Sequence, residues 1–260
     1  MKKTKIVAIS AGLLLSSSSA FAVISGTETN ACAISYADFV SAVQTAYVDT
    51  NGNGFGLPMW ATLMNSTGKV CHVTSVKGVA GTANGGLAAG RNAWLGSRVI
   101  SAQKANTANA FSLNGLAIST GAISATVYPG GSLYGLQHSN PVDTNVVYAG
   151  GPANFGTSTD PLAGTFPGGV NVFGGGVALY NSSGVKAGSV GVSGDTSCRD
   201  HTMAYRLRIA LTFNNEPNDD GLTLVDTTAG PLTGLFQQPA CGVNDPAVTV
   251  YQASDDNGIR

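Results

Sequence analysis

Apolar positions in the first part of the chain change from a helical spacing to a strand pattern. Between Ser35 and Val48 they recur three and four residues apart, which predicts an amphipathic helix. Two short apolar runs follow, at 59–64 and 70–76, and the polar segment 65–68 between them has the composition of a hairpin turn. The pattern therefore predicts a helix followed by two antiparallel strands.

A second helical pattern follows a glycine-rich segment at 79–90. Ser97 is the expected N-cap of this helix, and its interior is rich in alanine, which allows close packing on a sheet. A shorter helix is expected at 115–124. The next stretch, 140–169, is polar and rich in Gly, Pro and Asn, and a segment this long without periodicity is typical of a functional or interaction loop.

Strand patterns return after this loop, at 170–173, 177–180 and 186–192, and a last helix follows the N-cap candidates at 195–197. This order of elements predicts an α+β fold, an antiparallel five-stranded sheet flanked by helices. We expect one domain over residues 23–216, with the loop 140–169 as an insertion. Residues 217–260 lack helical or strand rhythm and are expected to form a C-terminal extension packed on the domain.

The first 22 residues have the layout of a secretory signal. Lysines at positions 2, 3 and 5 precede an apolar run, and Ala20–Ala22 is a small-x-small cleavage site. The apolar run is too short to span a bilayer, so no stable membrane insertion is expected. We therefore expect a periplasmic or secreted protein, cleaved near Ala22.

Charge and cysteine content fit this location. Cleavage leaves 10 basic against 14 acidic residues, and this mildly acidic balance argues against nucleic acid as a partner. Four cysteines remain, an even number that favours disulfides in an exported protein and allows three pairings. We favour Cys32–Cys71, which would tie the opening helix to a strand, and Cys198–Cys241, which would hold the tail on the domain.

Several common site motifs are absent from the sequence. It contains no GxSxG elbow and no HExxH zinc motif, and its glycine runs lack the Lys-Ser/Thr of a nucleotide P-loop. Residues 49–54 match the first half of an EF-hand loop, but Trp60 stands where the bidentate Glu is required. We therefore favour a simple turn there over a calcium site, and no pair of residues is assigned a catalytic role.

Several motifs in a fixed order resemble the GlcG/HbpS family. They are Met59-Trp60-Ala61-Thr62, Lys104-Ala105-x-Thr107-Ala108, Pro129-Gly130-Gly131, Phe173-Gly174-Gly175-Gly176 and Gly188-x-x-Gly191-Val192-Ser193-Gly194. The resemblance implies a profilin-like α/β/α fold, haem or a related tetrapyrrole as the cofactor, and assembly into a homo-oligomer.

Candidate ligand residues lie in and after the Pro129-Gly130-Gly131 segment. Gly130 and Gly131 would let the backbone approach a flat ligand, and Tyr134 and His138 follow in the same loop. Imidazole is a common axial ligand of haem iron, so His138 is the candidate metal ligand. Lys104 is expected on a solvated face or, alternatively, in an ion pair with a haem propionate.

Three functions follow from these observations. The first is an exported haem-binding protein, more binding protein than enzyme. The second is an enzyme that degrades or modifies haem or another small planar substrate, which depends on the family analogy alone. The third is a non-catalytic oligomeric assembly module, suggested by the long polar loop and the low charge.

Overall fold

The computed structural model of the chain describes residues 29–47, 54–77, 93–225, 232, 234 and 236–241. The predicted signal segment 1–22, most of the EF-hand-like segment and the glycine-rich segment 79–90 lie outside the described residues. Among the described residues, no helix has both the length and the apolar composition needed to cross a membrane.

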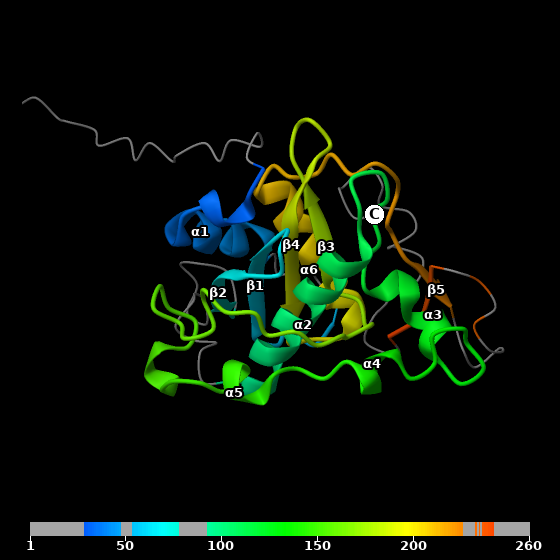
Figure 1. Ribbon diagram of the computed structural model, residues 1–260, viewed down its shortest axis with the longest axis horizontal. Coiled ribbons are helices and arrows are strands. Elements are labelled where there is room, and N and C mark those ends of the chain that lie inside the picture. The colour runs from blue at the N-terminus through cyan, green and yellow to red at the C-terminus, as the bar shows by residue number, and fades with distance from the viewer. Residues whose placement is uncertain are drawn as a thin grey trace, which may run out of the picture.

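The fold is a four-stranded antiparallel sheet flanked by helices, with a second sheet of two short parallel strands. The main sheet has the strand order β2-β1-β4-β3, which runs from left to right in Figure 1. The helices are α1 (Tyr36–Ala46), α2 (Leu95–Phe111), α3 (Ser124–Val127), α4 (Leu136–Ser139), α5 (Thr144–Val147) and α6 (Ser197–Ala210). The strands are β1 (Met59–Asn65), β2 (Val70–Val76), β3 (Gly176–Tyr180), β4 (Lys186–Ser193), β5 (Thr223–Val225) and β6 (Gln237–Pro239). Three 3-10 turns are η1 (Ala31–Ala33), η3 (Gly121–Ile123) and η4 (Pro152–Asn154).

The predicted α+β class is confirmed, but the main sheet has four strands and not five. The expected strand at 170–173 does not form, and this segment pairs with no strand among the described residues. Its N–H groups have other acceptors: the carbonyl of Asn140 for Val170, and the side-chain oxygens of Thr107 and Gln137 for the next two residues. Because these groups are already satisfied, the segment runs beside α2 without joining the sheet.

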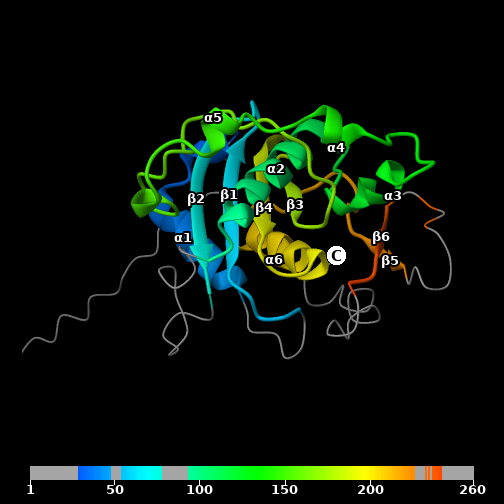
Figure 2. The same cartoon turned by 90° about the horizontal axis from the view of Figure 1, so that it is seen from below.

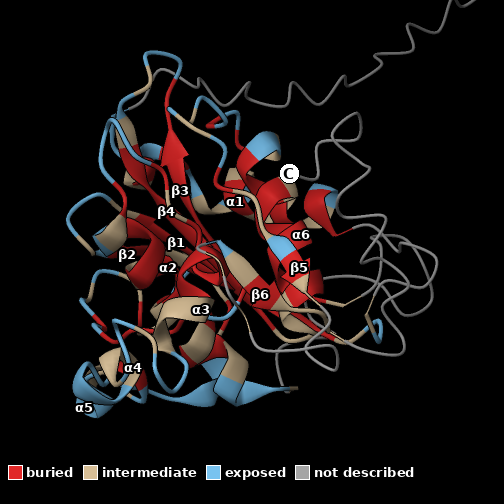
Figure 3. Ribbon diagram, turned by 90° about the vertical axis from the view of Figure 1, so that its right-hand side faces the viewer, coloured by how far each residue is buried: buried red, intermediate tan, exposed pale blue. Residues whose placement is uncertain are grey.

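The central strand β1 is buried on both faces, which explains its continuous apolar sequence. Met59 and Leu63 pack into one core with α1 and α6, whereas Trp60 and Met64 pack into a second core with α2. Successive strand residues point to opposite faces, so one strand supplies both cores. Figure 3 shows the strands of this sheet in the buried colour.

Helix α2 lies unusually close to β4. A Cβ on Gly191 would lie 2.0 Å from the backbone oxygen of Ser101 and 2.5 Å from the backbone nitrogen of Ala105. No side chain fits in this gap. The buried alanines of α2 and the glycines of β4 thus fix the separation of helix and sheet together.

Replacing Gly191 with alanine should lower the free energy of unfolding by about 1–3 kcal/mol, because overpacking forces a backbone shift. Chemical denaturation would measure this change. Gly115→Ala is the control, since nothing lies within 4 Å of the added Cβ there. Equal stabilities of the two variants would contradict the close packing of α2 on β4.

One of the predicted helices begins differently from expectation. Helix α1 begins where the pattern places it, and the hydroxyl oxygen of Ser35 caps it by accepting from the backbone N–H of Asp38. Helix α2, however, begins at Leu95, after Trp94 in the left-handed conformation (φ 52°), and not after a Ser97 cap. The indole of Trp60 donates to the carbonyl of Ala93, 2.9 Å away, which fixes the chain at this start.

The helix expected at 115–124 is wrong. This segment forms turns that lead into η3 and α3, and tertiary partners replace helical hydrogen bonds. The Asn218 side chain both accepts from the N–H and donates to the carbonyl of Ala117, and the Tyr180 hydroxyl donates to the carbonyl of Leu113.

The segment 140–169 crosses the α2 side of the molecule together with α4 and α5 (Figure 2). Its anchor is Asp160, which pairs with Arg98 of α2 and also accepts from the N–H groups of Gly156 and Leu162. Both side chains of the ion pair are almost completely buried. A charge pair inside the packing explains how a polar segment without apolar periodicity still takes a defined path.

Both disulfides have the pairing favoured from the sequence. Cys32–Cys71 joins η1 to β2, and Cys198–Cys241 joins the first turn of α6 to the chain just after β6. In this way one disulfide holds each end of the described fold.

Candidate functional site

A cavity, here called the larger cavity, lies beside the Pro129–Gly131 turn. Its volume is about 670 Å³, within the range of about 300–1,000 Å³ typical of small-molecule sites. The cavity is lined by Ala125, Tyr128, Pro129, Gly130, Gly131, Leu232 and Pro239. Two distant parts of the chain therefore form its walls, the α3 turn and the C-terminal residues around β6.

The two glycines of this turn have different roles. Gly130 has a φ of 89°, and nothing lies within 4 Å of the position where its Cβ would be. At Gly131 there is no space for a side chain, because a Cβ would lie 2.1 Å from the backbone oxygen of Thr126. Gly130 thus keeps the cavity wall open, while Gly131 lets the turn close on α3.

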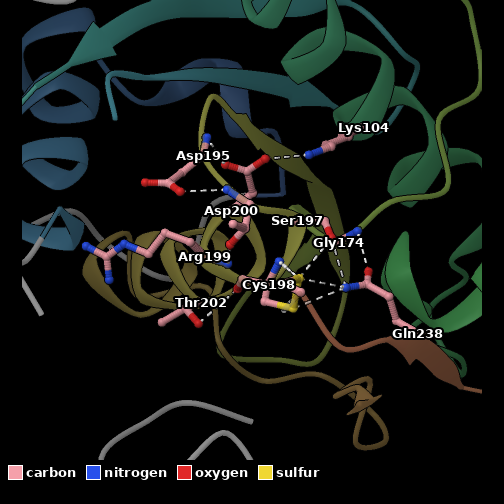
Figure 4. The surroundings of a disulfide bond; sticks show 11 residues. Lys104, Gly174, Asp195, Ser197, Cys198, Arg199, Asp200, Thr202 and Gln238 are labelled. Atoms are coloured by element: carbon pink, nitrogen blue, oxygen red, sulfur yellow. Dashed lines mark hydrogen bonds and ion pairs between the residues drawn. A yellow bond between two sulfur atoms is a disulfide. The ribbon is translucent and has the colours of Figure 1, made fainter. Parts of the chain in front are cut away.

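The C-terminal wall is held by contacts on both sides of β6. The backbone N–H of Phe236 donates to the carbonyl of Ala122 in η3. The Gln238 side chain accepts from the N–H of Gly174 and donates to the Ser197 hydroxyl, and the Cys198–Cys241 disulfide lies beside it (Figure 4). This wall therefore depends on residues that the sequence places in an unpatterned tail.

The five candidate ligand residues are not all brought together. Gly130 and Gly131 line the larger cavity. Tyr134 is 63% exposed in the turn after them, and His138 is exposed in the short helix α4; neither lines the cavity. Lys104 lies elsewhere, in α2 beside a second cavity.

The expectation of a solvated Lys104 is wrong. Its side chain is 2% exposed, and its ammonium group donates to Asp200 at 2.8 Å and to the carbonyl of Val192 at 3.1 Å. This ion pair is drawn in Figure 4. A lysine on a sequence of alanines gives no sign of a partner 96 positions away.

Gly175 makes room for the pair. With a φ of 121°, its Cβ would lie 3.0 Å from the Lys104 ammonium nitrogen and 2.9 Å from the Asp200 Cβ. The neighbouring Gly174 and Gly176 have similarly close contacts, with the carbonyls of Ser197 and Lys104. The Phe173-Gly174-Gly175-Gly176 motif therefore packs against the chain's own helices.

Asp200 was not among the sequence candidates, and its environment is unusual. Burial raises the pKa of its carboxyl from the ordinary 3.8 to about 6, although Lys104 and the backbone N–H of Asp195 oppose this shift. A buried carboxyl with a raised pKa beside a cavity is a functional-site signal. The sequence shows only a helix N-terminal acid here, which is common and uninformative.

The raised pKa of Asp200 predicts a pH-dependent stability. Between about pH 4 and pH 6 the native state holds the Asp200 proton more tightly than the unfolded state does. Proton binding at Asp200 therefore stabilises the native state fully at low pH, and this stabilisation is lost as the pH rises. The free energy of unfolding of the wild type relative to Asp200→Asn should fall by ~3 kcal/mol over this interval. Urea denaturation at several pH values measures this difference, and a difference that is constant or rises with pH would contradict it.

Metal-binding side chains do not gather anywhere in the described part of the chain. No group of three or more His, Cys, Asp or Glu residues there could hold a metal ion.

Parts of this chain are similar to known proteins. A family model described as "Haem degrading protein HbpS-like" matches residues 80–207. The crystal structure of Klebsiella pneumoniae protein ORFY, family DUF336, is 22% identical with a TM-score of 0.41, covering 68% of this chain and 90% of that chain. A structure of a PduOC–haem complex is 20% identical with a TM-score of 0.43, covering 70% of this chain and 98% of that chain. No curated protein matches the chain.

The family match includes α2, the Pro129–Gly131 turn, β3, β4 and most of α6. It therefore contains both residues of the Lys104–Asp200 pair and one wall of the larger cavity. Residues 80–207 of this chain match the HbpS-like family model, which confirms the resemblance predicted from the sequence.

Proposed function

We propose that this protein is an exported haem-binding protein and that its haem site is the cavity beside Pro129–Gly131. The observation that carries the proposal is this cavity of about 670 Å³, placed at a family motif of an HbpS-like segment. Two disulfides in the described chain are compatible with the export that the first 22 residues predict.

The residues around the cavity fit a tetrapyrrole. Its lining is mainly apolar, Tyr128 provides an aromatic side chain, and the open space at Gly130 would let a flat ring approach the backbone. No Lys or Arg lines the cavity among the described residues, so the propionates would face solvent. When bound, haem would supply iron-centred redox chemistry and Soret absorption.

His138 is our candidate axial ligand, with Tyr134 as the nearest alternative in the chain. Both side chains are exposed on the segment that follows the cavity-lining turn, and both residue types ligate haem iron. Leu133 and Tyr134 are exposed in the same turn, and we propose that a second copy of the chain covers this surface in a homo-oligomer.

Titration of the purified protein with haemin tests the proposal. A saturable Soret shift is expected at about one haem per subunit or per interface. His138→Ala should change the position of the Soret band, because it removes the axial imidazole. Ser139→Ala, on the next and equally exposed residue, is the control and should leave the spectrum unchanged.

The absence of a saturable shift would contradict haem binding itself. A normal spectrum of the His138→Ala complex would contradict only the choice of axial ligand. Incubation of the wild-type haem complex with ascorbate and oxygen, in the presence of catalase, distinguishes a binding protein from a haem-degrading enzyme. A persistent Soret band identifies a binding protein, and its loss identifies a haem-degrading enzyme.

A further inference from the structure

The second cavity, of about 280 Å³, lies at the end of the sheet where α2 and α6 meet. It is lined by Ser97, Ile100, Lys104, Phe173, Ser193, Gly194, Asp195, Ser197 and Asp200. None of these residues lines the proposed haem cavity. The two cavities are separate sites on the described part of the molecule.

A hydroxyl without a protein partner lies at this second site. Ser193 is 5% exposed, and its hydroxyl forms no hydrogen bond within the described residues. On β4 it follows Ser189, whose hydroxyl donates to the carbonyl of Ala105, so alternate residues place Ser193 on the α2 side as well. A hydroxyl at the cavity wall that has no protein partner can form a hydrogen bond with a bound ligand.

The charged groups of the cavity limit what that ligand can be. Both carboxylates already have donors: Asp195 accepts from the N–H groups of Phe55 and Leu57, and Asp200 accepts from Lys104. An anion would meet these two carboxylates, and a cation would meet the ammonium group of Lys104. The site therefore favours a neutral molecule.

The groups that remain unused are hydroxyls and one N–H. The Lys104 ammonium group has three N–H donors, and two of them form hydrogen bonds, with Asp200 and with the carbonyl of Val192. The hydroxyl of Ser193 can both donate and accept. A complementary ligand carries several hydroxyl or carbonyl oxygens.

The remaining wall is apolar. Phe173 is 45% exposed at the cavity, and Ile100 of α2 also lines it. An aromatic side chain beside polar groups suits a ring with C–H bonds on one face and hydroxyls at its edge, as in a sugar. At about 30 Å³ for each water, the volume corresponds to about nine waters, enough for one such ring.

We propose that this cavity is a second small-molecule site, which binds a neutral polyhydroxylated molecule of monosaccharide size. Lys104 and Ser193 hold its oxygens, and Phe173 packs against its C–H face. The Lys104–Asp200 pair is part of the site's floor and keeps one donor directed at the ligand.

Saturation-transfer NMR and calorimetric titration with D-glucose, D-ribose and myo-inositol test this proposal. At least one of these neutral probes should bind saturably, with a Kd of about 1–10 mM. Ser193→Ala should weaken that binding about 2- to 12-fold, the loss of one hydrogen bond. Ser182→Ala, in the exposed turn between β3 and β4, is the matched control and should bind as the wild type does.

D-gluconate is the anionic probe and D-glucosamine is the cationic probe in the same titrations. Tighter binding of either than of every neutral probe would overturn the proposed chemistry. Absence of saturable binding by all three neutral probes, or equal affinities of the Ser193→Ala and Ser182→Ala variants, would overturn the site. Because the cavities share no residue, the sugar titration is independent of haemin and stands whether or not haem binds.

Discussion

Replacing Asp220 with alanine should lower the free energy of unfolding by about 3–5 kcal/mol, because it removes the buried carboxylate that pairs with the buried Arg208 guanidinium. Asp220 is fully buried and belongs to the segment that follows α6. Its carboxylate accepts from Arg208 at 2.9 Å and 3.0 Å and from the hydroxyl of Tyr205. The variant would leave the Arg208 guanidinium, itself 1% exposed, with Glu216 at 3.0 Å as its remaining ion-pair partner among the described residues.

Denaturation in urea would measure this loss, with Asp219→Ala as the control. Asp219 is the exposed neighbour, and its carboxylate accepts only from the N–H of Gly221. The control should change the stability by less than about 1 kcal/mol. Similar stabilities of the two variants would show that the Arg208–Asp220 pair does not hold the segment after α6.

Removing the Cys198–Cys241 disulfide by serine substitution should lower the free energy of unfolding by about 4 kcal/mol and also weaken haemin binding. The stability loss follows from the 43-residue separation of the two cysteines, since the disulfide restricts the unfolded chain. The binding loss follows from geometry. Pro239, two positions before Cys241, lines the proposed haem cavity, and Leu232 belongs to the same tail.

The other disulfide provides a matched control. Cys32 and Cys71 are 39 positions apart, so serine substitution there should cost a similar free energy. It lies on η1 and β2, which contribute no residue to the cavity wall. Haemin affinity should therefore fall only when Cys198–Cys241 is removed. An equal fall in both variants would mean that global destabilisation, and not the tail wall, controls haem binding.

Local patterns were sufficient to predict the elements whose partners are close in sequence. Ser35 caps its own helix, and the hairpin of β1 and β2 follows directly from two apolar runs and a polar turn. β3 and β4 pair across a short turn in the same way. In each case the residues that decide the structure lie within a few positions of one another.

Predictions failed where distant partners decide the structure. The segment 170–173 has strand-like residues, but Thr107 and Gln137 take the hydrogen bonds that a neighbouring strand would need. Lys104 was expected in solvent because its partner, Asp200, lies on the helix across the sheet. The spacing of apolar residues in these two segments does not reveal which distant residues they contact.

Only one wall of the candidate site could be predicted from the sequence. The glycines at 130 and 131 marked one wall of the larger cavity, because a turn signal is local. The opposite wall comes from the tail, where Gln238 contacts Gly174 and Ser197 through side-chain hydrogen bonds. An unpatterned tail does not indicate where it will dock, so half of the cavity could not be found in the sequence.

Haemin titration of an Ala125→Trp variant tests most directly whether haem binds beside Pro129–Gly131. Ala125 is a half-buried residue of α3 that lines the cavity, and an indole there would fill the space. We expect a saturable Soret shift for the wild type and no such shift, at unchanged thermal stability, for the variant. An Ala125→Trp protein that takes up haemin with wild-type affinity would contradict this expectation.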